Sequence, residues 1–181
     1  MRNNLIVTAV LFQAILIAAA QLIYYFAFGA NIFENTIIGL SQVKNYFIGT
    51  FAGFGVFVLV YLLYLKLPSF RAWGQRQVMP MLKSFSTSEL LIMGITAGIA
   101  EEILFRGALQ PILGIFITSL LFGIVHYWFK KELLPYGIAA FCISILLGWS
   151  YEVSGNLIVP IAIHSVYNVS VILAIGRGLF D

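Results

Sequence analysis

LLIMGITAGIAEE, residues 90–102, is a run of uncharged, mostly apolar residues that ends in two adjacent glutamates. A helix needs about 20 apolar residues to cross the hydrocarbon core of a bilayer, and this run supplies most of one span. An ionised carboxylate inside a membrane costs at least about 2.5–3.5 kcal/mol. Glu101 and Glu102 are therefore expected to face polar partners rather than lipid, and to mark a functional site.

The composition of the chain agrees with a membrane location. Of its 181 residues, 61% are hydrophobic and 9% are charged, and the mean hydropathy is +1.00. Soluble domains are about 25% charged, so this composition indicates an integral membrane protein. The length suits one domain over residues 1–181. The net charge of +3 is small, and no nucleic-acid partner is predicted.

Six apolar stretches are long enough to be membrane spans: residues 5–28, 46–65, 90–107, 111–129, 133–151 and 157–175. We therefore expect an all-α fold, a polytopic transmembrane helical bundle of about six membrane-spanning helices. Two spans fall within residues 1–65, and four form a core over residues 86–175. The first apolar run exceeds the 7–15 residues of a signal-peptide core, so we expect it to stay as a helix.

Lysine and arginine gather in the segment 66–88 and at residues 130–131. The positive-inside rule places such loops in the cytoplasm. We therefore expect a multi-pass protein of a bacterial cytoplasmic membrane with both termini inside. Because residues 66–88 also contain Phe70, Trp73 and Met79, this segment is either an amphipathic segment at the membrane interface or a solvated loop.

The third span begins at a predicted capping box. Ser86 precedes Glu89 by three residues, so its hydroxyl can cap the helix while the Glu89 carboxylate bonds back to the Ser86 backbone. This assigns Glu89 a structural role. It also sets the register of the helix that carries the two adjacent glutamates.

The two glutamates have different surroundings along this helix. Gly94 and Gly98 form a GxxxG pair, which allows a neighbouring helix to approach closely. Glu101 lies about 20° from Gly94 around the helix axis, so we expect it on the packed face. Glu102 and Arg106 are spaced i,i+4 and can form an ion pair. Glu101 has no such cation nearby in sequence.

Two more spans carry polar residues. His126 lies in the fourth span, and His164 and Asn168 project from one face of the sixth because they are four residues apart. Each could be a structural polar residue when considered alone. Taken together, however, five ionisable residues and one amide in three spans indicate a polar site: Glu101, Glu102, Arg106, His126, His164 and Asn168.

Three motifs in this order resemble those of the CPBP family of CAAX proteases and bacteriocin-processing enzymes. EEILFRG at 101–107 resembles the EExxxR motif, FGIVH at 122–126 the FxxxH motif, and HSVYN at 164–168 the HxxxN motif. The resemblance covers residues 86–168. It implies an intramembrane endopeptidase that acts on a peptide or a membrane-associated protein, as the type II CAAX prenyl endopeptidases do.

The resemblance also implies roles for the residues that match the motifs. Glu101 would be the base and His126 its partner in activating water. His164 and Asn168 would stabilise the oxyanion, and Glu102 with Arg106 would support the site. No cofactor is expected. The lipid bilayer is a predicted partner, and the oligomeric state is left open.

Two other functions remain. A zinc protease could use Glu101, His126 and His164 as ligands, although the HExxH pattern is absent. A non-proteolytic immunity, scaffold or transport protein could also place charged residues in the membrane.

The connection between the third and fourth spans raises a question of depth. The stretch from Arg106 to His126 is short, and straight spans would place Glu101 and His126 at depths that differ by roughly 15 Å. Either Pro111 and Gly114 mark an irregular connection, or the two spans tilt and shift.

Overall fold

The computed structural model describes residues 2–33, 43–127 and 130–180, and side chains from residue 6 onward. The described residues contain helices, turns and bends, and no strand. The long helices are α1 (Arg2–Phe28), α2 (Val43–Lys66), α5 (Thr87–Glu102), α6 (Gln110–Tyr127), α7 (Leu134–Ser154) and α8 (Ile158–Gly176). The short ones are α3 (Pro68–Trp73), η2 (Gly74–Val78), α4 (Met79–Leu82), η3 (Ile103–Leu109) and η4 (Lys131–Leu133).

The all-α bundle is confirmed. Five helical stretches among the described residues are long and apolar enough to cross a membrane: Ile6–Phe28, Val43–Lys66, Thr87–Tyr127, Lys131–Ser154 and Ile158–Gly176. The third stretch is 41 residues long and contains both the third and the fourth expected spans. This stretch runs from α5 through the π-helical η3 into α6, so the five stretches account for all six expected spans.

This long stretch is not straight, because it folds back on itself at Gly114. Gly114 has φ 74° and ψ 168°, a backbone conformation that favours glycine. Beyond it, α6 packs against η3, and the rings of Phe105 and Phe122 lie 4.9 Å apart between centroids. Of the two alternatives for the short connection, the irregular turn is therefore the correct one. The reversal brings the end of α6 alongside the end of α5.

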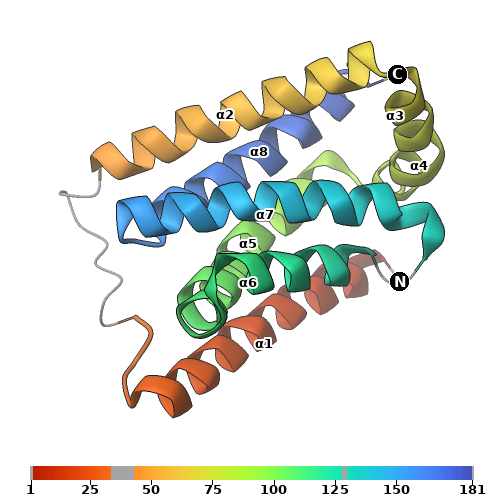
Figure 1. The fold of residues 1–181 in the computed structure, drawn as a ribbon. Helices are drawn as coiled ribbons and strands as arrows, with labels where there is room; N and C mark the ends of the chain where they lie inside the picture. The colour runs from red at the N-terminus through yellow and green to blue at the C-terminus, as the bar shows by residue number, and fades with distance from the viewer. Residues whose placement is uncertain (1, 34–42, 128–129, 181) are drawn as a thin grey trace.

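Helix α8 lies at the centre of the bundle. It packs against both α2 and α5, while α6 packs against α7, and α1 covers α5 and η3 (Figure 1). Small residues allow these close approaches. A methyl group at Gly98 would lie 2.5 Å from Ser165 Oγ of α8, and one at Gly53 would lie 2.5 Å from the Ile163 carbonyl oxygen. The expected glycine face on α5 is thus the face that meets α8.

The capping box at the start of α5 is confirmed. The Glu89 backbone N–H donates to Ser86 Oγ at 3.4 Å, and the Ser86 N–H donates to the Glu89 carboxylate at 2.6 Å. Both bonds satisfy backbone groups that a helix start leaves without partners.

One end of the bundle carries both chain termini, the segment 68–82 and η4 (Figure 1). Hydrogen bonds tie this end together: Tyr64 Oη of α2 donates to the Phe180 carbonyl at 2.6 Å, and Gln75 Nε2 donates to the same carbonyl. Trp73 Nε1 donates to the Glu132 carbonyl at 2.7 Å. We call it the basic end, after its cations: Lys66, Arg71, Arg76, Lys83, Lys130, Lys131 and Arg177. The segment 68–82 is helical rather than a loop, and its location at the membrane interface stays a prediction.

Candidate active site

The most buried part of the candidate site is an ion-pair cluster around Glu102. The Glu102 and Arg106 side chains are both 0% exposed, with Oε2 and Nε 3.1 Å apart, so the pair expected from their spacing is confirmed. Glu102 Oε1 accepts a 2.8 Å hydrogen bond from Nδ1 of His164. One carboxylate thus joins a residue of η3 to a residue of α8. A charge at this depth requires such partners, because its desolvation is costly.

Arg106 extends this cluster to a third helix. Its Nη2 donates to the backbone carbonyl of Ser144 at 3.0 Å and to Ser144 Oγ at 2.9 Å. Its Cζ lies 5.1 Å from the centroid of the Phe122 ring, which is a cation–π distance. Arg106 therefore holds η3, α6 and α7 together around Glu102.

Glu101 faces His126, on the side of α5 toward α6. Glu101 Oε2 and His126 Nε2 are 3.9 Å apart, and the two side chains are 21% and 19% exposed. His126 Nδ1 lies 2.7 Å from the Phe122 carbonyl oxygen. Because a carbonyl oxygen only accepts, Nδ1 carries the proton, and Nε2 of a neutral ring is an acceptor. Two acceptors therefore face each other beyond hydrogen-bond distance.

Phe122 lies between the two histidines. Its ring stacks on His126 with centroids 4.3 Å apart and meets His164 in a T-shaped contact at 6.1 Å. Since Phe122 also contacts Arg106 and accepts from His126 through its backbone, it is the packing centre of the site.

The structure brings together five of the six expected residues. Asn168 lies one turn beyond His164 on α8, and its Nδ2 donates to the Gly94 carbonyl at 3.0 Å. This bond ties α8 to the glycine face of α5. The role of Asn168 as an oxyanion donor stays a prediction.

The burial of the two glutamates differs from the helical-wheel expectation. Glu101 does lie at the packed part of α5, but Glu102 is the more deeply buried residue. The physical reason is that Gly98, not Gly94, makes the closest approach to α8. Glu102 follows Gly98 by four residues, so it lies about 40° away around the helix and points at the same neighbour.

The zinc alternative finds no preformed ligand set. Among the residues that the structure describes, no three His, Cys, Asp or Glu side chains are grouped closely enough to hold a metal ion. In the arrangement of the described side chains, Glu101, His126 and His164 are not grouped as the three ligands of a catalytic zinc ion.

Several residues of the site could not be found from the sequence. Ser144 and Gln110 are buried, and Gln110 Nε2 donates to the Gly148 carbonyl of α7 at 3.0 Å. Tyr136 meets the His126 ring with centroids 5.5 Å apart. Small hydroxyl residues and aromatic residues are common in membrane helices, so their types alone gave no signal. Only Phe122 carried a signal in the sequence, because it lies four residues before His126 and begins the FxxxH motif.

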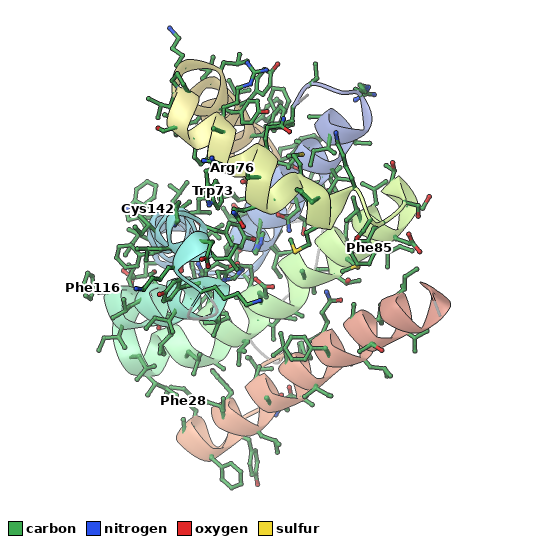
Figure 2. All side chains as sticks on the ribbon, turned by 90° about the vertical axis from the view of Figure 1, so that its right-hand side faces the viewer. Phe28, Trp73, Arg76, Phe85, Phe116 and Cys142 are labelled. Carbon is green, nitrogen blue, oxygen red and sulfur yellow. The ribbon has the colours of Figure 1, made fainter. Side chains whose placement is uncertain are left out.

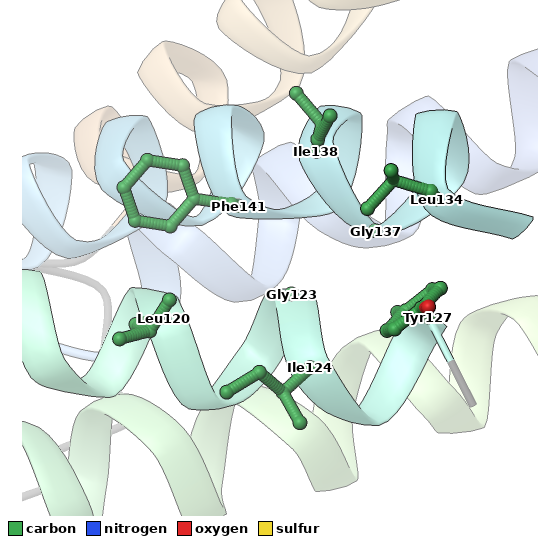
Figure 3. Close-up of a pocket in the computed structure, with 8 residues that line it drawn as sticks. All are labelled: Leu120, Gly123, Ile124, Tyr127, Leu134, Gly137, Ile138 and Phe141. Atoms are coloured by element: carbon green, nitrogen blue, oxygen red, sulfur yellow. The ribbon is translucent and has the colours of Figure 1, made fainter. Parts of the chain in front are cut away.

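An apolar groove of about 210 Å³ lies beside the site, between α6 and α7 (Figure 3). Its floor is formed where Gly123 and Gly137 meet: a methyl group at Gly123 would lie 2.8 Å from the Gly137 carbonyl oxygen. Its walls are apolar or aromatic: Leu120, Ile124, Tyr127, Leu134, Ile138 and Phe141. No ionisable residue of the candidate site lines it.

Comparison with known proteins gives a match over the core of the chain. Residues 83–170 match a family model described as type II CAAX prenyl endopeptidase Rce1-like. The uncharacterized protein YpbD of Bacillus subtilis is 38% identical over 79 residues, 44% of this chain and 41% of that protein. The UPF0177 protein YxdF of Lactococcus lactis is 35% identical over 82 residues, 42% of this chain and 44% of that protein.

These matches cover part of each protein. The chain spans less than half the length of the two curated relatives. No solved structure matches the chain. All the candidate residues nevertheless lie within the matched residues 83–170.

Proposed function

We propose that this chain, whose residues 83–170 belong to the Rce1-like family of CAAX-type membrane proteases, is an intramembrane endopeptidase that uses glutamate-activated water. Its long apolar helices and this family together indicate an integral, multi-pass membrane protein. The observation that carries the proposal is the facing pair of Glu101 Oε2 and His126 Nε2, 3.9 Å apart.

In the proposed mechanism, one water molecule donates to both acceptors. A water oxygen about 2.8 Å from each atom fits a separation of this size. Glu101 takes the water proton as the water oxygen bonds to the peptide carbonyl carbon. The tetrahedral oxyanion then collapses, the C–N bond breaks, and the proton passes from Glu101 to the leaving nitrogen. A positioned base of this kind is worth about 10²–10⁴ in rate.

His164 and Asn168 are the proposed oxyanion donors. His164 Nδ1 donates to Glu102, so the other ring nitrogen, Nε2, is the proposed donor to the oxyanion. Nε2 donates when the ring is doubly protonated, and the Glu102 carboxylate then balances the positive charge. The Asn168 amide has a second N–H besides the one bonded to Gly94. Removing one donor of this kind typically costs about 10²–10³ in kcat.

The substrate we propose is a peptide segment at the membrane surface, reached from the basic end. His126 is one residue from the end of α6, and Lys130 and Lys131 follow it at this end. The positive-inside rule favours a cytoplasmic location for the basic end. The relatives' descriptions leave open whether the substrate carries a prenyl group.

Cleavage by the purified chain in proteoliposomes tests the function. Two peptides are compared, a prenylated CAAX peptide and an unprenylated peptide anchored by an acyl chain. We expect cleavage of at least one, and its loss in Glu101→Gln and His126→Asn but not in Glu132→Gln, an exposed acid of η4. A folded wild-type chain that cleaves neither peptide would favour a non-proteolytic role.

A chelator separates this mechanism from the zinc alternative. We expect the cleavage rate to be unchanged after treatment with a strong zinc chelator, because the described side chains provide no three-ligand cluster. Loss of activity that added Zn²⁺ restores would contradict the proposal.

A further inference from the structure

The His126 ring is contacted from more than one direction. Phe122 stacks on one face, with an interplanar angle of 26°, and the Phe122 carbonyl binds Nδ1. Tyr136 meets the ring in a T-shaped contact, with centroids 5.5 Å apart and an interplanar angle of 67°. The χ2 torsion of histidine is broad, so a single hydrogen bond does not fix where Nε2 points. The aromatic contacts restrict that torsion further.

Tyr136 lies in the first turn of α7, and the residue is 41% exposed. Tyr136 thus contacts a residue of the candidate site without belonging to any of the three sequence motifs.

Trp73 supports Tyr136 from the other side. The two rings stack with centroids 6.5 Å apart and an interplanar angle of 26°. Trp73 itself is held by Phe70, which stacks on it at 5.8 Å, and by the hydrogen bond from Nε1 to the Glu132 carbonyl. Figure 2 shows Trp73 on the side of the segment 68–82 that lies toward α7. A continuous row of rings therefore runs from that segment to His126.

We propose that Tyr136 and Trp73 are positioning residues that hold the His126 ring with Nε2 toward Glu101. Through Trp73, the orientation of His126 depends on the docking of the segment 68–82 onto η4 and α7. The kinetic part of this inference rests on the proposed peptidase function, while the orientation of the ring does not.

Kinetics test the role of the rings. Tyr136→Phe and Trp73→Phe keep a ring at each position and should retain most of the activity. Tyr136→Leu and Trp73→Leu should lower kcat by about 3- to 10-fold, the value of one aromatic contact, with little change in KM. The matched control is Trp149→Leu, which removes the ring of a 58% exposed residue of α7 and should leave kcat unchanged. Equal kcat in the Leu variants and the wild type would overturn the proposal.

A second measurement does not depend on cleavage. The chain has two histidines, so ring-labelled histidine gives two sets of NMR signals in detergent micelles, and His126→Asn assigns them. Tyr136→Leu and Trp73→Leu should shift the His126 signals and leave those of His164 in place, which also shows that the fold is intact. Unchanged His126 signals would overturn the proposal even in an active chain. Shifted signals in a chain that cleaves nothing would refute the peptidase function alone and support the positioning of the ring.

Discussion

Breaking the buried ion pair of Glu102 and Arg106 should cause a large loss of stability. Glu102→Gln keeps the size of the side chain and removes its charge, so Arg106 stays fully buried without its carboxylate. Breaking a buried pair by removing one partner costs about 3–5 kcal/mol. We therefore expect Glu102→Gln to lower the free energy of unfolding by about that amount. In contrast, Glu132→Gln on the exposed η4 should change it by no more than about 0.5 kcal/mol.

A double-mutant cycle makes this prediction sharper. Arg106→Met removes the other charge, and it also costs about 3–5 kcal/mol because the buried Glu102 carboxylate then loses its guanidinium partner. In the double variant neither charge remains, so its cost should fall short of the sum of the single costs by about 3 kcal/mol or more. The assay is reversible unfolding by SDS in mixed micelles, followed by tryptophan fluorescence.

Two results would refute the reasoning. A cost below about 1 kcal/mol for Glu102→Gln is the value of an exposed pair and would mean that water reaches the cluster. Single costs that add within about 0.5 kcal/mol would mean that the two side chains do not interact in the folded chain.

Two further substitutions test the packing and the start of α5 in the same unfolding assay. Gly98→Ala places a methyl group 2.5 Å from Ser165 Oγ and should lower the free energy of unfolding by about 1–3 kcal/mol. The control is Gly55→Ala, whose methyl group meets nothing within 4 Å. Equal losses of stability in the two variants would contradict the close approach of α5 and α8. Ser86→Ala removes the acceptor for the Glu89 N–H and should cost about 0.5–2 kcal/mol, and an unchanged stability would show that the cap is dispensable.

Local features of the site were predictable from the sequence. The capping box and the pair of Glu102 with Arg106 depend on spacings of three and four residues, which helix geometry converts directly into contacts. The three motifs indicated the family, and the match over residues 83–170 confirms that resemblance. The apolar runs predicted the helices to within a few residues, although the chain reverses at Gly114, inside α6, rather than between α5 and α6.

Contacts between distant residues were not predictable in the same way. The bond of His164 to Glu102 spans 62 residues, and that of Arg106 to Ser144 spans 38. Such contacts depend on how the helices pack, and a single sequence does not specify this packing. The reversal at Gly114 is an intermediate case, since glycine permits the required backbone angles without demanding them.

The prediction that Glu101 and His126 lie at different depths was wrong because it ignored how the helices pack. It assumed straight helices, but the chain turns back at Gly114, so a residue 25 positions later returns to the level of Glu101. Gly114 is visible in the sequence, but the reversal at this residue depends on the packing of α6 against η3, which the sequence does not reveal.

The central claim is that Glu101, facing His126, activates the water that cleaves the peptide. Its most direct test is kcat for Glu101→Gln in proteoliposomes, with the unfolding free energy of the same variant measured alongside. Glu101 Oε2 has no hydrogen-bond partner among the described residues, so the variant should fold with near wild-type stability while kcat falls by about 10²-fold or more. A stable Glu101→Gln chain that cleaves its peptide at the wild-type rate would contradict the account.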